Sequence, residues 1–297
     1  GVARGDLDAV LPGHGTRAAV VLRQVGLAFD EANRLRLLAP LREYVQREHP
    51  PLPGDLPNVL SHYVGLALST QVGAEGGADA LARLTPEIEN VEGAILRRLD
   101  EPQSRIAVEA AIKLAEFARF TGLGTTEPLE KALAITSTEE SNDLAADCCA
   151  RLADIALVRC DHEAARARYE EAFPLYTSAG DVVGAANCIV SLGNLALVRS
   201  EQETARTCFM KALPLYLRLG NVAGQANCAK GLGDIALERS DHATARTQFE
   251  DALQLYRSIG AVLGEVNCIK GLGDIARERS DLETARTRYE EALPLYK

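Results

Sequence analysis

From residue 141 onward, hydrophobic and polar positions recur along the chain with a period of forty residues. Each period holds a block of apolar residues and alanines at helical spacing, followed by the pattern Ala-Arg-x-x-aromatic-x-x-Ala, and so predicts a pair of antiparallel helices. In the third period we expect the first helix between Val222 and Arg239, with Cys228 and Leu232 on its buried face. The four periods align without a gap as residues 141–180, 181–220, 221–260 and 261–297.

Start and stop signals mark the ends of these predicted helices. Ser200–Glu203 and Ser280–Glu283 have the spacing of a capping box, in which the serine hydroxyl accepts a hydrogen bond from the backbone at the glutamate. Gly220 and Gly260 follow second helices, where a left-handed residue is expected. A proline inside three of the second helices is expected to kink or loosen them: Pro174, Pro214 and Pro294.

Upstream of residue 141 the period fades, although the pattern stays helical. Residues 57–100 are expected to form helices, and Ala111–Ala118 with Leu129–Ile135 predict a degenerate earlier pair. The first residues differ, because Val25–Phe29 and Arg34–Leu38 have the character of two strands joined by a turn. A helix after Pro40 and a linker at His49–Gly54 are expected to follow. The predicted regions are therefore 1–56, 57–140 and 141–297.

The repeated residues resemble a known family. Leu232-Gly233 followed by Ala245, Phe249 and Ala252 resembles the tetratricopeptide repeat. The forty-residue form, with N-C-x-x-G-L-G-D-I-A and A-R-x-x-Y-E-E-A-L-P-L-Y, is similar to the repeats of Pins-type spindle-orientation adaptors and of many fungal and bacterial signalling ATPases. This resemblance implies an all-α fold, a right-handed superhelical solenoid of helix pairs whose first helices line an inner groove.

Two shorter stretches point to the second of these groups. Leu84–Val91 resembles the L-x-x-E-x-x-N-L signature of STAND-class, NLR-like signalling ATPases of the NB-ARC type. Arg34–Val45 is similar to the tail of their winged-helix segment, which implies a short α/β remnant at the N-terminus. The chain starts at Gly1 rather than at a methionine and stops just short of a full repeat. We therefore expect a piece of a longer polypeptide, with a nucleotide-binding core before Gly1 through which the protein self-associates.

Composition and cysteine spacing exclude several classes of function. A net charge of −10 and the absence of tryptophan argue against nucleic-acid binding. No apolar run is long enough to cross a membrane. Cysteines at one position of every repeat are expected to be buried, reduced packing residues rather than disulfides or metal ligands, which suits a cytoplasmic protein: Cys148, Cys188, Cys228 and Cys268.

Catalytic chemistry is not indicated by any motif. Gly13–Arg17 lacks the lysine and the spacing of a phosphate loop. The string Lys-Gly-Leu-Gly at residue 270 recurs forty residues earlier, so it predicts architecture rather than a nucleotide site. His162 and His242 fall at the turns between helices, where exposure to solvent is expected. We therefore predict no enzyme, no cofactor and no metal site.

The face of the first helices opposite the predicted core is the candidate binding site. Its packing neighbours barely change between repeats, whereas its own residues change from apolar and acidic to zwitterionic. Asparagine amides there form a potential ladder for the backbone of an extended peptide, although they could equally bond to a neighbouring helix. Each lysine could bind a ligand carboxylate or pair with the acidic residue four positions on. The predicted site residues are Asn187, Asn194, Asn227, Lys230, Asp234, Glu238, Asn267, Lys270, Asp274 and Glu278.

Two hypotheses for function remain open at this point. The first is a protein-binding or peptide-binding array that acts as the sensor of a STAND/NLR-like signalling ATPase. The alternative is a stand-alone adaptor of the Pins type, which assembles partner proteins without ATPase activity. The alternative leaves the first fifty or so residues unexplained, whereas the first hypothesis accounts for the order of all three regions.

Overall fold

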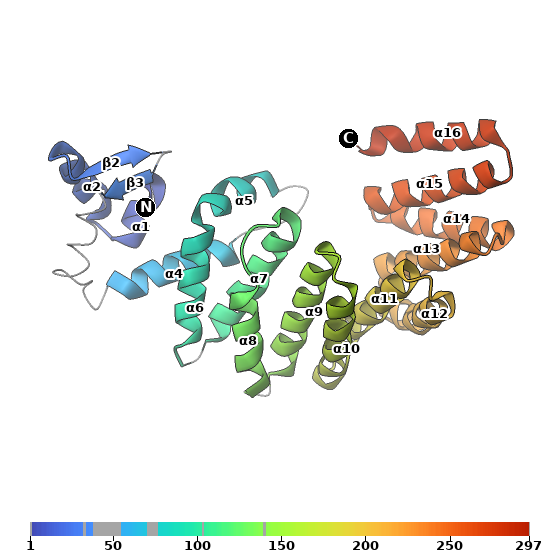
Figure 1. Ribbon diagram of the computed structural model, residues 1–297, viewed down its shortest axis with the longest axis horizontal. Coiled ribbons are helices and arrows are strands. Elements are labelled where there is room, and N and C mark those ends of the chain that lie inside the picture. Colours follow the sequence, from blue (N-terminus) through green and yellow to red (C-terminus); the bar gives the residue numbers. More distant parts are fainter. Residues whose placement is uncertain are drawn as a thin grey trace. The chain divides into compact units, whose positions relative to one another are not determined.

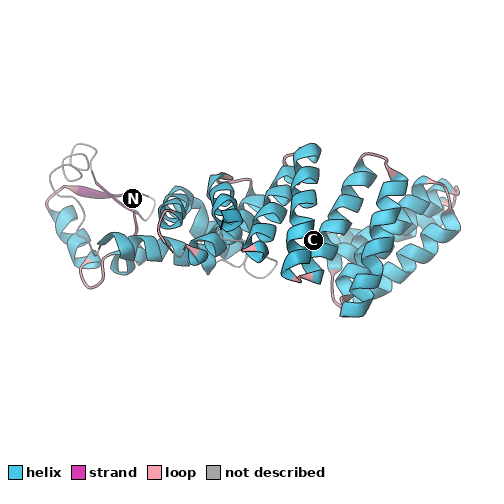
Figure 2. Cartoon of the chain, turned by 90° about the horizontal axis from the view of Figure 1, so that it is seen from below, coloured by secondary structure: helices cyan, strands magenta, loops and turns pink. Residues whose placement is uncertain are grey.

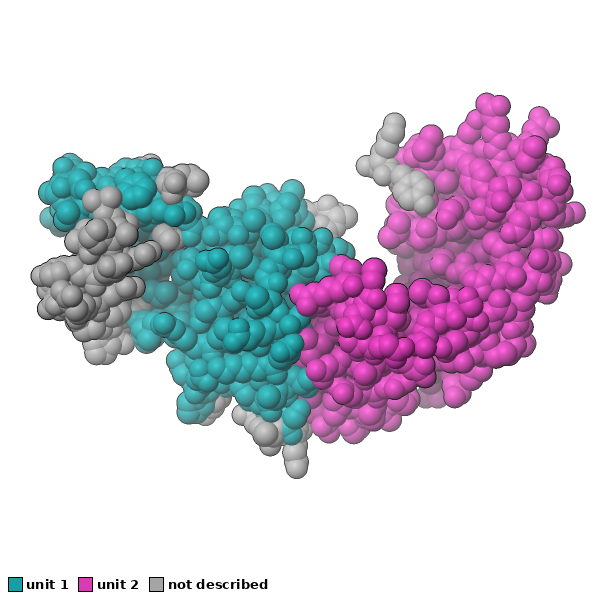
Figure 3. Space-filling model, in the orientation of Figure 1, with its two compact units in different colours: residues 1–139 teal, residues 140–297 magenta. Residues whose placement is uncertain are grey.

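The computed structural model describes residues 2–31, 34–37, 55–69, 77–102, 104–138 and 141–296. The chain divides into two compact units, Gly1–Glu139 and Glu140–Lys297, which are coloured separately in Figure 3. The helix expected after Pro40 and the linker at His49–Gly54 lie outside the described residues. Each unit is considered by itself below.

The second unit is a row of helix pairs joined by short turns (Figure 1 and Figure 2). Within each pair the two helices pack against one another along their lengths. The expectation of an all-α solenoid of antiparallel helix pairs is therefore confirmed. The elements are α9 (Asn142–Val158), α10 (His162–Ala179), α11 (Val182–Val198), α12 (Gln202–Leu219), α13 (Val222–Glu238), α14 (His242–Ser258), α15 (Val262–Glu278), α16 (Leu282–Ala292) and the 3-10 turn η3 (Leu293–Tyr296).

The first helices of successive repeats form the more closely spaced layer of this unit. Helix α11 lies against α13, and α13 lies against α15, whereas the second helices of the described repeats make no comparable contact with one another. In a curved stack of two layers, the layer with the shorter spacing is on the inside. The first helices therefore line the inner side of the unit.

Glycine residues let the helices approach the aromatic side chains that form the core. A Cβ atom on Gly273 would lie 2.7 Å from the ring of Tyr289 on the second helix of the same repeat. A Cβ atom on Gly271 would lie 2.8 Å from the ring of Phe249 in the preceding repeat. Both glycines of the string at residue 270 are thus packing positions, as the repetition of that string predicts. Close packing offsets the roughly 1 kcal/mol by which glycine disfavours a helix relative to alanine.

The turns inside the helix pairs correct the predicted capping boxes. Ser200 and Ser280 have φ values of 60° and 61°, so each is the left-handed residue that ends a first helix. The backbone N–H of Ser200 bonds to the carbonyl of Leu197, and that of Glu201 bonds to Ala196, which is the Schellman arrangement. The serine is therefore bound to the preceding helix and cannot cap the following one.

The residue after the serine position is the true N-cap of the second helix. Asp241 and Asp281 each accept a 3.1 Å hydrogen bond from a backbone N–H three residues on, and Asp161 accepts one of 3.0 Å. Glu201 stands at the same place without a side-chain cap. The prediction was wrong by one residue, because two adjacent polar residues both satisfy the sequence pattern.

The far ends of the second helices agree better with expectation. Gly220 and Gly260 have φ values of 64° and 66° and close their turns in the left-handed conformation, as predicted. Helices α10 and α12 continue past Pro174 and Pro214 to Ala179 and Leu219. At the fourth repeat the α-helix ends at Ala292 and the proline lies in the following 3-10 turn.

The first unit contains the helices that the sequence predicts and a small sheet. The helical elements are α4 (Asp55–Leu68), α5 (Gly77–Leu84), the 3-10 turn η2 (Thr85–Glu87), α6 (Ile88–Leu99), α7 (Arg105–Thr121) and α8 (Glu127–Thr138). Helices α7 and α8 contact each other, as expected of a degenerate pair. Ahead of them lie β1 (Val2–Ala3), the 3-10 turn η1 (Arg4–Asp6), α1 (Leu7–Val10), α2 (Gly15–Gln24), β2 (Ala28–Glu31) and β3 (Arg34–Leu37).

The predicted hairpin is present, but its first strand starts later than expected. Strands β2 and β3 pair antiparallel with Phe29 opposite Arg36, and β1 adds to the other edge of β3. The preceding Val25 and Gly26 close helix α2 instead, with Gly26 at a φ of 73°. Helix α2 and strand β1 were not expected from the sequence pattern.

A buried ion pair ties this sheet to the helices of the first unit. Arg34 on β3 is only 8% exposed and donates to the carbonyl of Pro86 at 2.8 Å and to the carboxylate of Glu87 at 3.0 Å. Asn90 donates to the same carboxylate at 2.7 Å. The glutamate and asparagine of the L-x-x-E-x-x-N stretch therefore hold the sheet and the helices together.

Candidate partner-binding groove

The ten site residues predicted from the sequence lie on the open side of the first helices, and we call the surface that they form the inner strip. Most of the surface of α13 is buried by its neighbours, and the exposed remainder is a narrow strip along the inner side. The exposed members are Asn187, Asn194, Asn227, Glu238, Lys270 and Glu278. The half-buried members are Lys230, Asp234, Asn267 and Asp274. Burial raises the pKa of Asp234, and the strips of adjacent repeats are close enough for Lys270 in the next repeat to oppose that rise.

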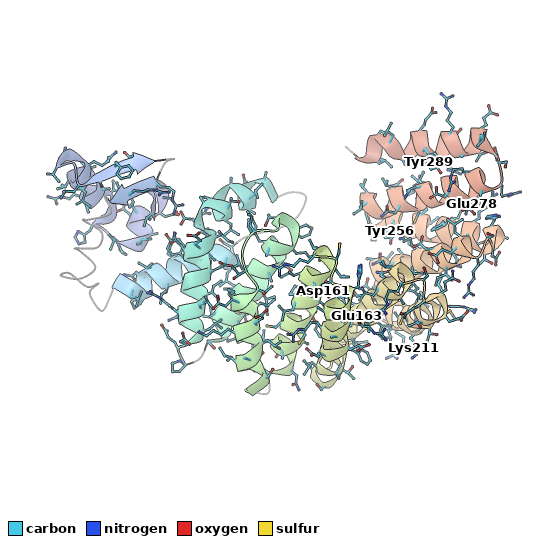
Figure 4. The ribbon with its side chains drawn as sticks, viewed as in Figure 1. Asp161, Glu163, Lys211, Tyr256, Glu278 and Tyr289 are labelled. Atoms are coloured by element: carbon cyan, nitrogen blue, oxygen red, sulfur yellow. The ribbon has the colours of Figure 1, made fainter. Side chains whose placement is uncertain are left out.

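Tyrosines from the second helices bind the asparagines of this strip. The hydroxyl of Tyr216 donates to Oδ1 of Asn187 at 2.7 Å, and that of Tyr256, which is labelled in Figure 4, donates to Oδ1 of Asn227 at 2.6 Å. Desolvation of the hydroxyl raises the pKa of Tyr256, so it remains a donor throughout the physiological range. These two amide oxygens thus have a structural role. Bonding to a neighbouring helix is one of the two roles that the sequence pattern allows for them, and peptide binding is the other.

In the first repeat the equivalent tyrosine donates its hydrogen bond to a carboxylate instead of an amide. Tyr176 donates to Oδ1 of Asp147 at 2.6 Å. A partner for Asn267 falls at residue 296, whose side chain lies outside the described residues. The sequence pattern did not lead us to predict these three tyrosines. Each lies 29 residues after its acceptor, and this constant separation could have identified them.

A second set of tyrosines binds two aspartates of the first helices. Tyr169 donates to Asp154 at 2.5 Å, and Tyr289 donates to Asp274 at 2.7 Å. Phenylalanine replaces this tyrosine in the second and third repeats. There Asp234 pairs with Lys230 at 2.8 Å instead, and Asn194 makes no hydrogen bond to any described residue. Burial raises the pKa of Asp234 above its ordinary value in spite of that lysine.

Three polar side chains of the strip have no hydrogen-bond or ion-pair partner among the described residues. Lys270 and Asn194 are exposed, and Asn267 is half-buried. Glu238 accepts a 3.0 Å hydrogen bond from Gln202, and Glu278 lies 3.8 Å from the ring of His242. The carboxylates of Glu238 and Glu278 therefore each lie near a side chain of a second helix, at the edge of the strip.

The strip changes character from one end of the unit to the other. Val198 is 65% exposed at the position that Glu238 occupies one repeat later, and Val158 is similarly open. The first two repeats thus present apolar groups to the groove, whereas the last two present both signs of charge. A surface with this gradient suits a segment whose two ends differ in polarity.

The histidines and cysteines of the repeats have structural positions. Cys148, Cys188, Cys228 and Cys268 are buried and free, as predicted, and burial raises the pKa of Cys228 to about 12. His162 and His242 were expected to be exposed but are half-buried. Their Nδ1 atoms are buried and make no hydrogen bond to any described residue.

In the described parts of the chain, no group of three or more His, Cys, Asp or Glu side chains converges to hold a metal ion. None of the described helices is both long and apolar enough to span a membrane. What the strip offers is an open surface with hydrogen-bonding, charged and apolar positions at a regular spacing.

Comparison with known proteins places the repeats in a recognised class. The family model of the tetratricopeptide repeat matches residues 187–258 and 225–297. None of the curated proteins matches the chain. Among solved structures, aspartyl phosphate phosphatase F from Bacillus subtilis is 10% identical, with a TM-score of 0.57 and 97% of this chain and 82% of that one covered.

Two further solved structures share the fold at similar levels. BtubC from P. vanneervenii is 16% identical over 80% of this chain and 91% of that one, with a TM-score of 0.53. A Signal Transduction ATPase with Numerous Domains from Pyrococcus horikoshii, which has a tetratricopeptide repeat sensor, is 15% identical with a TM-score of 0.52. It covers 99% of this chain, which spans 48% of that protein. Residues 187–297 of this chain thus match the tetratricopeptide repeat.

Proposed function

We propose that the inner strip of α11, α13 and α15 binds an extended segment of a partner protein. The observation that carries this proposal is the pair of exposed polar side chains without a partner among the described residues, Asn194 and Lys270. On the same strip, tyrosines bind Asn187 and Asn227, and Asp234 pairs with Lys230. Asn194 offers a donor and an acceptor to a peptide backbone, and Lys270 offers a cation to a carboxylate.

The change from apolar to charged residues along the inner strip suggests the orientation and composition of that segment. Adjacent repeats are roughly 10 Å apart, which is about three residues of an extended chain at ~3.3 Å each. An apolar part would lie over Val158 and Val198, and a carboxylate would follow near Lys270. Asn187 and Asn227 contribute through their Nδ2 groups, since their oxygens are already engaged.

We further infer that the chain is the sensor region of a STAND/NLR-like signalling ATPase. Three observations support this inference: the order of the regions, the role of Glu87 and Asn90 in joining the sheet to the helices, and the fold shared with the Pyrococcus horikoshii STAND protein. The nucleotide-binding core would then be encoded upstream of Gly1, and a coding sequence with no Walker A lysine there would contradict the sensor role alone.

Site-specific photo-crosslinking in the full-length protein tests the groove. A photoreactive residue replaces Asn194 or Lys270 in the strip, and Thr287 on the exposed side of α16 as the matched outer position. We expect one partner to be captured from the inner positions and not from Thr287. Substituting Asn194→Ala and Lys270→Ala together should abolish that capture while the melting temperature stays unchanged. Equal capture from all three positions would show that the strip has no special role.

A further inference from the structure

Helix α12 differs from the other second helices on its outer face. Its residues Met210 and Lys211 stand where the other repeats have two acidic residues: Glu170-Glu171, Glu250-Asp251 and Glu290-Glu291. It carries the cations Arg206, Lys211 and Arg218 against a single acidic residue, Glu203. Within a chain whose net charge is −10, this helix is a local basic surface.

The loss of the acidic pair also frees the cations of α12. In α10, Arg166 pairs with Glu170 at 2.9 Å, and in α16, Arg286 pairs with Glu290 at 2.7 Å. Arg206 has Met210 at that place and forms no ion pair with any described residue. Lys211 is likewise unpaired and exposed on α12 (Figure 4).

Apolar side chains lie on the same side of α12 as Arg206. Met210 is 55% exposed and Leu217 is 58% exposed, and together with Arg206 they fall within a narrow arc of the helix. Thr177 and Arg257 replace Leu217 in the first and third repeats, so no other second helix repeats this combination. Methionine adapts its shape to varied apolar partners, which suits a contact surface.

A hollow next to Met210 gives this face a receptacle for a side chain. It has a volume of about 370 Å³ between α12, α13 and α14 and is lined by the apolar side chains of Leu232 and Ile235, by Arg206 and Arg239, and by one carboxylate, that of Asp241. The equivalent hollow one repeat earlier is about 160 Å³ and has Glu170 in place of Met210. The hollow beside α12 thus combines an apolar lining, an exposed methionine and, in Arg206, an arginine that forms no ion pair with any described residue.

We propose that the outer face of α12 is a second binding surface, which takes an acidic segment of a partner protein with one large apolar side chain in this hollow. The carboxylates of the segment face Arg206, Lys211 and Arg218, and the apolar side chain contacts Met210 and Leu232. The negative charge on the rest of the chain repels such a segment and so directs it to this basic face. This surface belongs to a second helix and is separate from the inner strip of the first helices.

A protein segment matches the observations better than the other occupants do. A nucleic acid would use the three cations but has no group for the apolar hollow, and its phosphates would be repelled by the rest of the acidic chain. A second copy of this chain would have to present an acidic helix with an exposed apolar side chain. Both remain distinguishable in the experiment below.

The decisive variant gives two positions of α12 the residues found at the same positions in the other repeats. Met210→Glu with Lys211→Glu installs the pair found in α10 and α16, so the fold should be kept, which circular dichroism and a thermal melt verify. A displayed library of random sixteen-residue peptides is selected on the wild-type protein. The selected peptides are then measured by fluorescence polarisation against wild type, this variant and the inner-strip variant Asn194→Ala with Lys270→Ala.

The proposal expects acidic peptides that contain Leu, Met or Phe, whose affinity falls at least tenfold in the α12 variant and is unchanged in the inner-strip variant. Their affinity should also fall severalfold when salt is raised from 0.05 to 0.5 M. Selected peptides that are neutral or basic, or that bind both α12 sequences equally, would overturn it. So would an oligonucleotide that displaces the peptides at equal strength, or self-association abolished by the same two substitutions. Failure here leaves the inner strip untouched, and the inner-strip variant reports on that site separately.

Discussion

Tyr216 lies between two repeats: its hydroxyl donates to Asn187 in its own repeat at 2.7 Å, and its ring covers Gly224 at the start of the next. The same relationship joins Tyr256 to Asn227 and Gly264. One side chain therefore fixes both the angle of its helix pair and the approach of the following pair. The asparagine of the inner strip is part of this connection before it is part of any binding site.

Removing the Tyr216 hydroxyl should weaken the array measurably. Tyr216→Phe leaves the oxygen of Asn187 without its donor and should lower the free energy of unfolding by about 0.5–1.5 kcal/mol. Chemical denaturation followed by circular dichroism measures the change. Asn187→Asp is the matched control, because Asp147 accepts the same bond in the first repeat, and it should be nearly neutral. Identical stability of wild type and Tyr216→Phe would mean that water replaces the bond at no cost.

Gly231 should not tolerate a methyl group. A Cβ atom there would lie 2.5 Å from the ring of Phe209, so Gly231→Ala should destabilise by about 1–3 kcal/mol through overpacking. Gly93 in α6 has open space around its Cβ position, so Gly93→Ala should instead stabilise by about 0.5–1 kcal/mol through helix propensity. Opposite signs in thermal melts of the two variants are the expected outcome, and two stabilising substitutions would disprove the close packing.

Ile235 and Leu232 should differ in their importance for stability. Ile235 is 3% exposed, and Ile235→Ala should cost about 2–5 kcal/mol by leaving a cavity. The sequence pattern gave Leu232 the same role, but it is half-buried and borders the hollow beside α12. Leu232→Ala should therefore cost less than Ile235→Ala in urea denaturation. A larger loss at Leu232 would contradict the burial described here.

Alkaline pH should destabilise the repeats through their buried thiols. The pKa of Cys228 is raised by burial from about 9 to about 12, so the folded protein keeps a proton that the unfolded chain releases. Its contribution to stability is present below pH 9 and is lost as the pH rises from about 9 to 12. One such group changes the unfolding free energy by about 1.4 kcal/mol per pH unit within that window.

Cys228→Ala tests this dependence directly. The variant should lose stability less steeply than wild type between pH 9 and 10.5, even if its stability at pH 7 is lower. Exposed Cys160 provides the control, since Cys160→Ser should leave the slope unchanged. Equal slopes for wild type and Cys228→Ala would show that the thiol is not shielded.

The period of forty residues was sufficient to predict the helix pairs, because each repeat buries the same positions of both helices. It could not reveal which polar groups meet. Asn187 and Asn194 look alike in sequence, yet one is bound by Tyr216 and the other is unbound because Phe209 has no hydroxyl. That difference depends on how one helix is rotated over the next.

The N-terminal elements were harder to predict for a different reason. Strand β1 is two residues long, and its pairing with β3 across thirty or so residues leaves no local periodicity. The capping residue was misplaced because Ser200 and Glu201 both suit a helix start, and the backbone geometry of the preceding turn decides between them. Local sequence patterns therefore do not predict the structure at positions where a distant or neighbouring element determines the backbone conformation.

The aromatic-on-glycine contacts between repeats have an evolutionary consequence. Tyr176 on Gly184 and Tyr216 on Gly224 make the joint on either side of residues 181–220 the same. A forty-residue unit can therefore be duplicated, deleted or exchanged by recombination with both of its joints intact. The unit that holds the basic helix α12 can be moved along the array in this way, so selection can reposition the surface proposed above without redesigning its scaffold.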